Sequence, residues 1–188
     1  MASTDASGTW RPIITALVVY TVVGLVLGVS AAFLVIYSGV FNVAATAEDA
    51  PPLRWVLVTT REASVRSHAK AIEPPRLDGT QHVENGFRIF QKQCAMCHAP
   101  PGRQATMMAK GLNPEAPPLP ELVSDMNDAE LFWVTKNGIR FTGMPAWASS
   151  HNDAEIWDVV AFMRASTTMR PADYGALDQR LSGPATTK

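Results

Sequence analysis

Residues 83–98 read VENGFRIFQKQCAMCH and hold the chain's two cysteines, Cys94 and Cys97, with His98 directly after the second. The apolar residues before Cys94 recur at helical spacing, so Val83–Gln93 is predicted to form a helix that runs into the motif. Two thiols at this spacing can form thioethers to the two vinyl groups of one haem, and the next histidine then lies against the iron as an axial ligand. The motif therefore predicts one covalently attached haem c.

Three other interpretations of the motif are a zinc site, a redox-active dithiol and a chance match. A zinc site needs two further ligands, and His82 and His151 are the nearby options; we otherwise expect both to be solvent-facing polar residues. A dithiol motif is expected between a strand and a helix, whereas here a helix leads into the cysteines. Covalent haem accounts best for the motif.

We assign the second axial position on the iron to Met144. It lies in the segment Gly138–Pro145, which reads GIRFTGMP. A loop opened and tightened by glycines can bring a side chain across the haem face, and the proline after Met144 restricts its backbone to an extended form. A thioether ligand favours ferrous iron and raises the reduction potential. Met107 and Met108 are the rival methionines.

With this attachment motif and this methionine loop, the segment 77–169 resembles a class I c-type cytochrome domain. The family has a glycine and an aromatic residue four apart on the N-terminal helix, and Gly86 and Phe90 stand in those places. The resemblance implies an all-α haem domain whose first and last helices cross closely. Val159 and Phe162 on the last helix are the expected partners.

The resemblance also implies a proline whose carbonyl accepts the hydrogen bond from the ligand histidine's Nδ1–H. Pro117 stands in that place, with Pro118 a close second and Leu119 as the leucine that follows in the family. Such a bond fixes the histidine tautomer and raises the basicity of the ligand. The predicted cofactor site is therefore Cys94, Cys97, His98, Met144 and Pro117, with His98 and Met144 as the iron ligands.

A long apolar run precedes this domain. No charged residue occurs from Ile13 to Val43, which is long enough for one transmembrane helix. A cleaved signal peptide is the alternative, but its apolar region is typically about 7–15 residues. Gly24, Gly28 and Ala32 recur every four residues and offer a face for another helix. The expected organisation is 1–12 cytoplasmic, 13–43 a transmembrane anchor, 44–76 a linker, 77–169 the haem domain and 170–188 a C-terminal tail.

The linker is expected to contain one amphipathic helix, Leu53–Ile72, between two Pro-Pro pairs. Its apolar stripe consists of Trp55, Val58, Val65, Ala69 and Ile72. A basic amphipathic helix after a membrane span can lie on the lipid surface, and it can equally pack on a partner subunit or on the haem domain.

The remaining patterns concern the structure of the domain. Asn-Asp-Ala-Glu occurs at 127–130 and 152–155, and each copy predicts a capping box that opens a helix. Trp133, Phe141 and Trp147 are expected to line the haem pocket, with Trp147 or Arg140 in reach of a haem propionate. The tail from Ala172 lacks periodicity and is expected to be irregular.

These features favour an electron carrier over an enzyme, because no paired carboxylates or nucleophile–base arrangement is evident. The net charge of −1 argues against a nucleic-acid partner. The family attaches its haem outside the cytoplasm, which implies a single-pass protein of the bacterial inner membrane with a periplasmic haem domain. The expected partners are the lipid bilayer and other redox subunits. The alternatives are a freely operating tethered shuttle and a haem enzyme or gas sensor.

Overall fold

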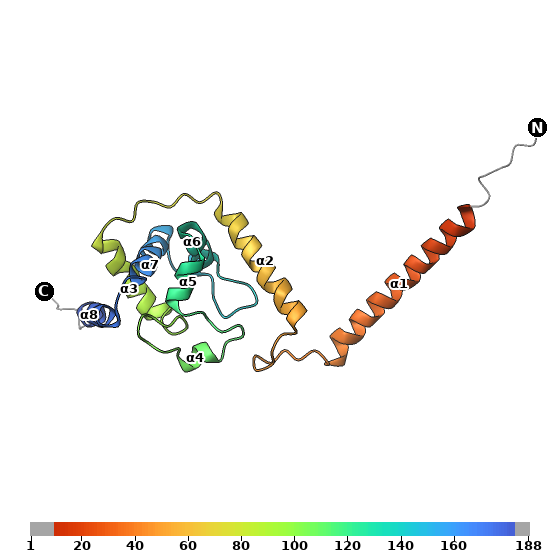
Figure 1. Ribbon diagram of the computed structural model, residues 1–188, viewed down its shortest axis with the longest axis horizontal. Helices are drawn as coiled ribbons and strands as arrows, with labels where there is room; N and C mark the ends of the chain where they lie inside the picture. The colour runs from red at the N-terminus through yellow and green to blue at the C-terminus, as the bar shows by residue number, and fades with distance from the viewer. Residues whose placement is uncertain (1–9, 183–188) are drawn as a thin grey trace, which may run out of the picture. The chain divides into compact units, whose positions relative to one another are not determined.

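The computed structural model describes residues 10–182, and all regular elements within them are helices. The chain divides into two compact units, 1–47 and 48–188. Figure 1 shows the long helix of the first unit and the helical domain of the second. This agrees with the all-α architecture predicted from the sequence.

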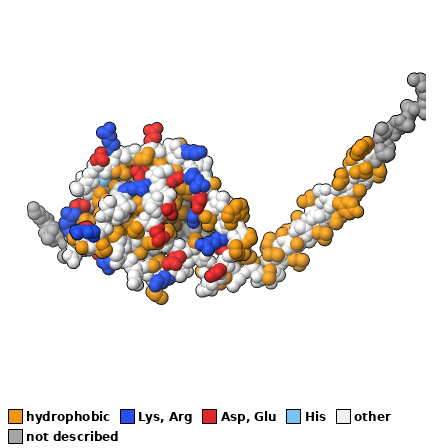
Figure 2. All heavy atoms as spheres, in the orientation of Figure 1, with side chains coloured by type: hydrophobic (Ala, Val, Ile, Leu, Met, Phe, Trp, Pro, Cys, Tyr) orange, Lys and Arg blue, Asp and Glu red, His pale blue; other side chains and the backbone are white. Residues whose placement is uncertain are grey.

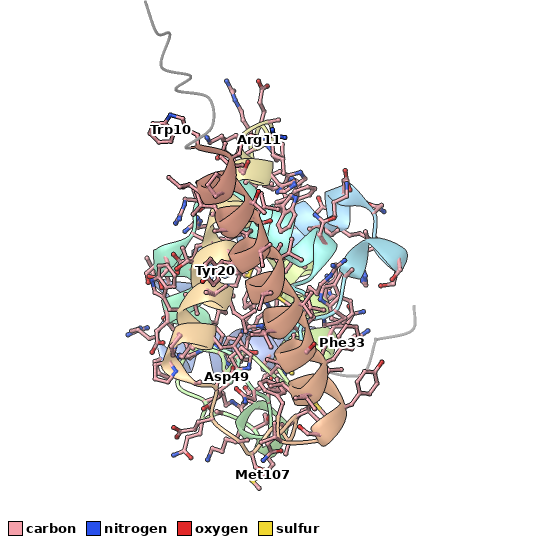
Figure 3. All side chains as sticks on the ribbon, turned by 90° about the vertical axis from the view of Figure 1, so that its right-hand side faces the viewer. Trp10, Arg11, Tyr20, Phe33, Asp49 and Met107 are labelled. Carbon is pink, nitrogen blue, oxygen red and sulfur yellow. The ribbon has the colours of Figure 1, made fainter. Side chains whose placement is uncertain are left out.

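The first unit contains α1, Trp10–Ser38, which has no charged residue after Arg11 and buries none of its residues. Hydrophobic side chains are spread along it in Figure 2, and Tyr20 and Phe33, labelled in Figure 3, are 76% and 53% exposed. The helix is long and apolar enough to be a candidate membrane span. It begins three residues before the predicted anchor and ends at Ser38, because Gly39 takes a positive φ of 69°.

The second unit is a bundle of helices around one apolar core. In chain order the elements are α2 Pro51–Ala69, α3 Thr80–Gln93, α4 Met107–Lys110, α5 Leu119–Asp125, α6 Asp128–Asn137, η2 Trp147–Ser149, α7 Asp153–Ser166 and α8 Pro171–Ser182.

The centre of the core is the crossing of α3 and α7 (Figure 1). Gly86 permits it, because a Cβ there would lie 1.8 Å from the Asp158 carbonyl oxygen and 2.9 Å from the Phe162 Cβ. Phe87 and Phe90 pack against Phe162 at ring-centroid distances of 5.4 and 5.1 Å. The close crossing implied by the resemblance is therefore present.

Both predicted capping boxes are confirmed. The Asn127 side chain accepts from the Glu130 amide at 3.0 Å, and the Glu130 carboxylate accepts from the Asn127 amide at 2.9 Å. Asn152 and Glu155 form the same pair at the start of α7. These caps satisfy backbone N–H groups that a helix start otherwise leaves without partners.

The linker helix α2 packs on the haem domain through its C-terminal half. Val65 and Ala69 are buried, and the His68 imidazole stacks on the Trp133 indole of α6 at 5.2 Å. Along the predicted stripe, Val65 and Ala69 are buried and Val58 is half-buried, whereas Trp55 is 68% exposed. The ring of Trp133, which was expected to line the haem pocket, lies against His68 at the contact between α2 and α6.

The tail was expected to be irregular, and this is wrong for 171–182, which form α8. Tyr174 is buried among the core aromatics and its hydroxyl donates to the Gln91 Oε1 of α3. Arg180 pairs with Glu84 at 2.8 Å. The sequence did not predict this helix, because few of its side chains are buried and its apolar residues therefore show little helical periodicity.

Arg164 of α7 is a second feature that the sequence did not reveal. Its guanidinium pairs with Asp128 and donates to the carbonyl oxygens of Val123 at 2.7 Å and Met126 at 2.5 Å. One side chain thus holds the end of α5 and the start of α6 against α7. An arginine after the apolar run Val159–Met163 of α7 was the available signal.

Candidate haem site

The attachment motif begins where α3 ends. The amides of Cys94 and Ala95 both donate to the Phe90 carbonyl, at 2.8 and 2.9 Å, and the His98 amide donates to the Cys94 carbonyl at 2.9 Å. These bonds wind the motif into tight turns, and Phe90 itself is fixed in the core. The crossing of α3 and α7 therefore sets the position of both cysteines.

The two thiols do not form a disulfide. Burial first, and the neighbouring Cys97 second, raise the pKa of the Cys94 thiol to about 12. Redox-active dithiols have thiol pKa values below the ordinary one. The raised pKa of Cys94 is thus the opposite of the lowered thiol pKa that a redox-active dithiol needs.

The ring of His98 is held by the loop before α5. Its Nδ1 lies 2.8 Å from the Pro117 carbonyl oxygen, so the hydrogen bond implied by the family resemblance is present, on Pro117 rather than Pro118. The Leu119 amide donates to the Ala99 carbonyl at 3.0 Å, and Leu119 is fully buried, which fixes this loop against the motif.

This arrangement leaves Nε2 as the atom of His98 that can bind iron. Burial lowers the pKa of His98, and the bond to Pro117 acts in the opposite direction. The lowered pKa favours the neutral imidazole, which is the ligand form.

Met144 lies in a loop whose two ends meet at Gly138. This glycine ends α6 with φ 67°, and a Cβ there would lie 2.6 Å from the Pro145 carbonyl carbon and 2.8 Å from the Met144 oxygen. The Ile139 amide donates to the Met144 carbonyl at 3.3 Å. No residue other than glycine fits both the angle and the space.

Thr142 tightens the same loop and was missed in the sequence. Its hydroxyl donates to the Ile139 carbonyl at 2.7 Å and accepts from the Met144 amide at 3.1 Å. A threonine two residues before a methionine, in a stretch with two glycines, is the signal that could have identified it. The backbone of Met144 is therefore fixed on both sides, and its side chain is half-buried.

The rival methionines occupy a different environment. Met107 and Met108 begin the short helix α4 and are 85% and 56% exposed, and Figure 3 shows Met107 projecting away from the domain. Phe141 is 77% exposed at the tip of the Met144 loop, and Trp147 is half-buried beside His151.

The two remaining histidines of the domain have specific partners, and the His82 side chain is also 45% exposed, as expected of a solvent-facing residue. His82 Nδ1 lies 2.5 Å from the carboxylate of Asp158. His151 is half-buried and contacts Gln93 at 3.3 Å and the Ser150 hydroxyl at 2.9 Å. Within residues 10–182, no three His, Cys, Asp or Glu side chains come together as a metal ion would require. The zinc interpretation therefore lacks further ligands there.

The donor set fits haem c. Two thiols stand in one turn with a histidine oriented by a backbone carbonyl, and a separate glycine-closed loop presents a thioether. Two thiols and an adjacent imidazole are the groups that attach haem c and ligate its iron.

Comparison with known families supports this assignment. Residues 81–163 match the family described as cytochrome C oxidase, cbb3-type, subunit III. Comparison with curated proteins found no match.

The domain is therefore a class I c-type cytochrome domain with covalently attached haem c, and the protein is an electron-transfer haem protein. With the apolar helix α1 before this domain, the chain fits a membrane-anchored monohaem cytochrome c.

Proposed function

We propose that this protein is a membrane-tethered electron carrier, with iron ligated by His98 and Met144, and that it serves as a subunit of a larger membrane oxidoreductase. Haem c supplies a one-electron couple when bound. The chain's own residues hold the couple in place, because Pro117 fixes the His98 ring and the Gly138 closure fixes the backbone of Met144. With both axial positions filled, no site remains for a substrate.

The single observation that carries the ligand assignment is the closed loop around Met144. A fixed backbone lowers the entropy cost of holding a thioether on iron. Met107, by contrast, is almost fully exposed on a four-residue helix. Thioether ligation raises the potential, which suits a carrier that accepts electrons from one centre and passes them to a stronger oxidant.

Two observations favour a fixed subunit over a freely moving shuttle. The matching family is described as a subunit of an oxidase, and the connection between α1 and α2, residues 39–50, is short and holds one glycine and no serine, unlike a flexible Gly/Ser chain. We further propose that the haem domain faces the periplasm and that α1 spans the inner membrane.

The ligand assignment is tested with carbon monoxide. In the full-length, haem-loaded protein, the ferrous form should not bind carbon monoxide, whereas Met144→Ala should bind it and show a lower reduction potential. Met107→Ala is the matched control and should behave as the wild type. An Met144→Ala protein that stays six-coordinate at an unchanged potential would show that another residue is the ligand.

The subunit role is tested by extraction in mild detergent. A partner that carries a further cofactor and copurifies in fixed ratio with the haem supports it. A cytochrome that always elutes alone, yet is reduced and oxidised by separate membrane proteins, supports the tethered shuttle instead.

A further inference from the structure

The two halves of α2 have different surroundings. Its C-terminal half belongs to the haem domain, where Val65 and Ala69 are buried and His68 stacks on Trp133. Its first eight residues, 51–58, read PPLRWVLV and contain one charge, Arg54. Trp55, Val56 and Leu57 are 68%, 48% and 37% exposed, although they follow one another along the helix.

Consecutive residues in a helix point about 100° apart, so these three side chains together span about 200° of the helix surface, and Arg54 lies on the remaining side. A helix surface that is apolar over so wide an arc is normally covered by an apolar environment. The haem domain covers this segment only in part, because Leu53 and Val58 are half-buried whereas Trp55, Val56 and Leu57 stay exposed.

The chain itself indicates what covers the segment. Twelve residues, 39–50, separate the end of the candidate span α1 from Pro51. Fully extended, they reach at most about 40 Å, and a hydrogen-bonded turn at Ala44–Ala47 shortens them. The first turns of α2 therefore cannot move farther than this chain length from the point where a spanning α1 leaves the bilayer.

We propose that residues 51–58 insert among the lipid headgroups of the membrane that α1 spans. Tryptophan prefers this zone, since its ring is apolar and its N–H is polar, and Arg54 can extend its guanidinium to the lipid phosphates. Leu53, Val56 and Leu57 supply the apolar area that interfacial helices bury.

The proposal rests on the membrane anchoring proposed above and goes beyond it. Because the same helix is rigidly packed on α6 through its other half, docking of its first turns fixes the orientation of the haem domain to the bilayer plane. The domain would then present one constant face to its electron-transfer partners, where a flexible tether would let it rotate.

The test places a single fluorescent probe at chosen points of the full-length protein in lipid nanodiscs. Both native cysteines are bound to haem in the mature protein, so an introduced cysteine can be labelled alone with an NBD dye. Lipids that carry a nitroxide quencher near the headgroup are compared with unmodified lipids. The ratio of the two intensities cancels quenching by the haem.

The label at Val56→Cys should be quenched roughly twofold or more by the shallow quencher. The label at Ser67→Cys, on the exposed side of the C-terminal half, should not be quenched. Trp55→Glu should abolish the quenching at position 56, whereas the matched change Ser67→Glu should leave it intact. Equal quenching at positions 56 and 67 would contradict the proposal, since α2 would then lie flat rather than dock by its first turns.

Val26→Cys, in the middle of α1, separates this proposal from the anchoring on which it rests. Quenching at position 26 by a deep nitroxide, without quenching at position 56, would leave the anchor intact and overturn the docking. Residues 51–58 would then be covered by protein or exposed to water. No quenching at position 26 would overturn both.

Discussion

Replacing Gly86 by alanine should force α3 and α7 apart, because the two helices touch there at backbone distance. The new Cβ would lie 1.8 Å from the Asp158 carbonyl oxygen and 2.4 Å from its carbonyl carbon. Real Cβ contacts are essentially never shorter than 3.0 Å, so the helices must separate by about 1.2 Å. The obstacle is helix backbone, which cannot rotate aside as a side chain can.

Overpacking of a core typically costs about 1–3 kcal/mol, and a backbone clash belongs at the upper end. Alanine recovers up to about 1 kcal/mol through its better helix propensity. The expected net loss is therefore about 2 kcal/mol in the free energy of unfolding, or roughly a 30-fold change in the unfolding equilibrium. Phe90 and Phe162 meet at the same crossing, so the attachment turn after Phe90 should loosen as well.

The assay is denaturant unfolding of the full-length protein in detergent, followed by helix circular dichroism and by the haem absorption band. Gly175→Ala in α8 is the matched control, because no atom lies within 4 Å of its new Cβ. It should be neutral or stabilising by up to about 1 kcal/mol. If Gly86→Ala were as stable as Gly175→Ala, the crossing would be looser than described and the reasoning refuted.

Three further predictions concern the loop, the core and the tail. Gly138→Ala should release the Met144 loop, because alanine is strained at the φ of 67° found there. The ferrous protein should then bind carbon monoxide while keeping its covalent haem. An unchanged absorption spectrum under carbon monoxide would show that Gly138 is not needed to hold the Met144 loop closed. Arg164→Met should lower the free energy of unfolding by about 2–3 kcal/mol, since Asp128 and two carbonyls lose their partner, whereas Lys136→Met, which removes one ion pair to the 62% exposed carboxylate of Asp153, should cost less than about 1 kcal/mol. Burial, aided by Asp178 and opposed by Arg103, raises the pKa of Tyr174 to about 12 from an ordinary 10.0, so stability present below pH 10 should be lost between about pH 10 and 12. Tyr174→Phe should make that decline shallower in unfolding curves taken across this range, and an equal decline in both proteins would assign it to other groups.

Many features of the haem domain could be predicted from interactions between residues that are close together in the sequence. The capping boxes, the glycine at the end of α6 and the helix before Cys94 each depend on residues within about four positions of one another. Such signals are complete in the sequence, because backbone geometry fixes which neighbours can interact.

Long-range partners were harder to predict. Arg164 finds its acceptors some 40 residues away, and Thr142 acts only because the loop closes at Gly138. The helix α8 escaped prediction because it is held by a few distant contacts, such as that of Tyr174 with Gln91, rather than by a continuous apolar face.

The sequence alone determined the chemistry of this protein. The thiol spacing, the adjacent histidine and the uncharged apolar run specify covalent haem and a candidate anchor, because each depends on covalent spacing or on segment length. The tertiary structure decided which proline holds His98, which part of α2 the domain buries and which part it leaves apolar and exposed. These depend on how close separate helices approach, and here that distance is set by Gly86, where the lack of a side chain lets α3 and α7 meet at backbone distance.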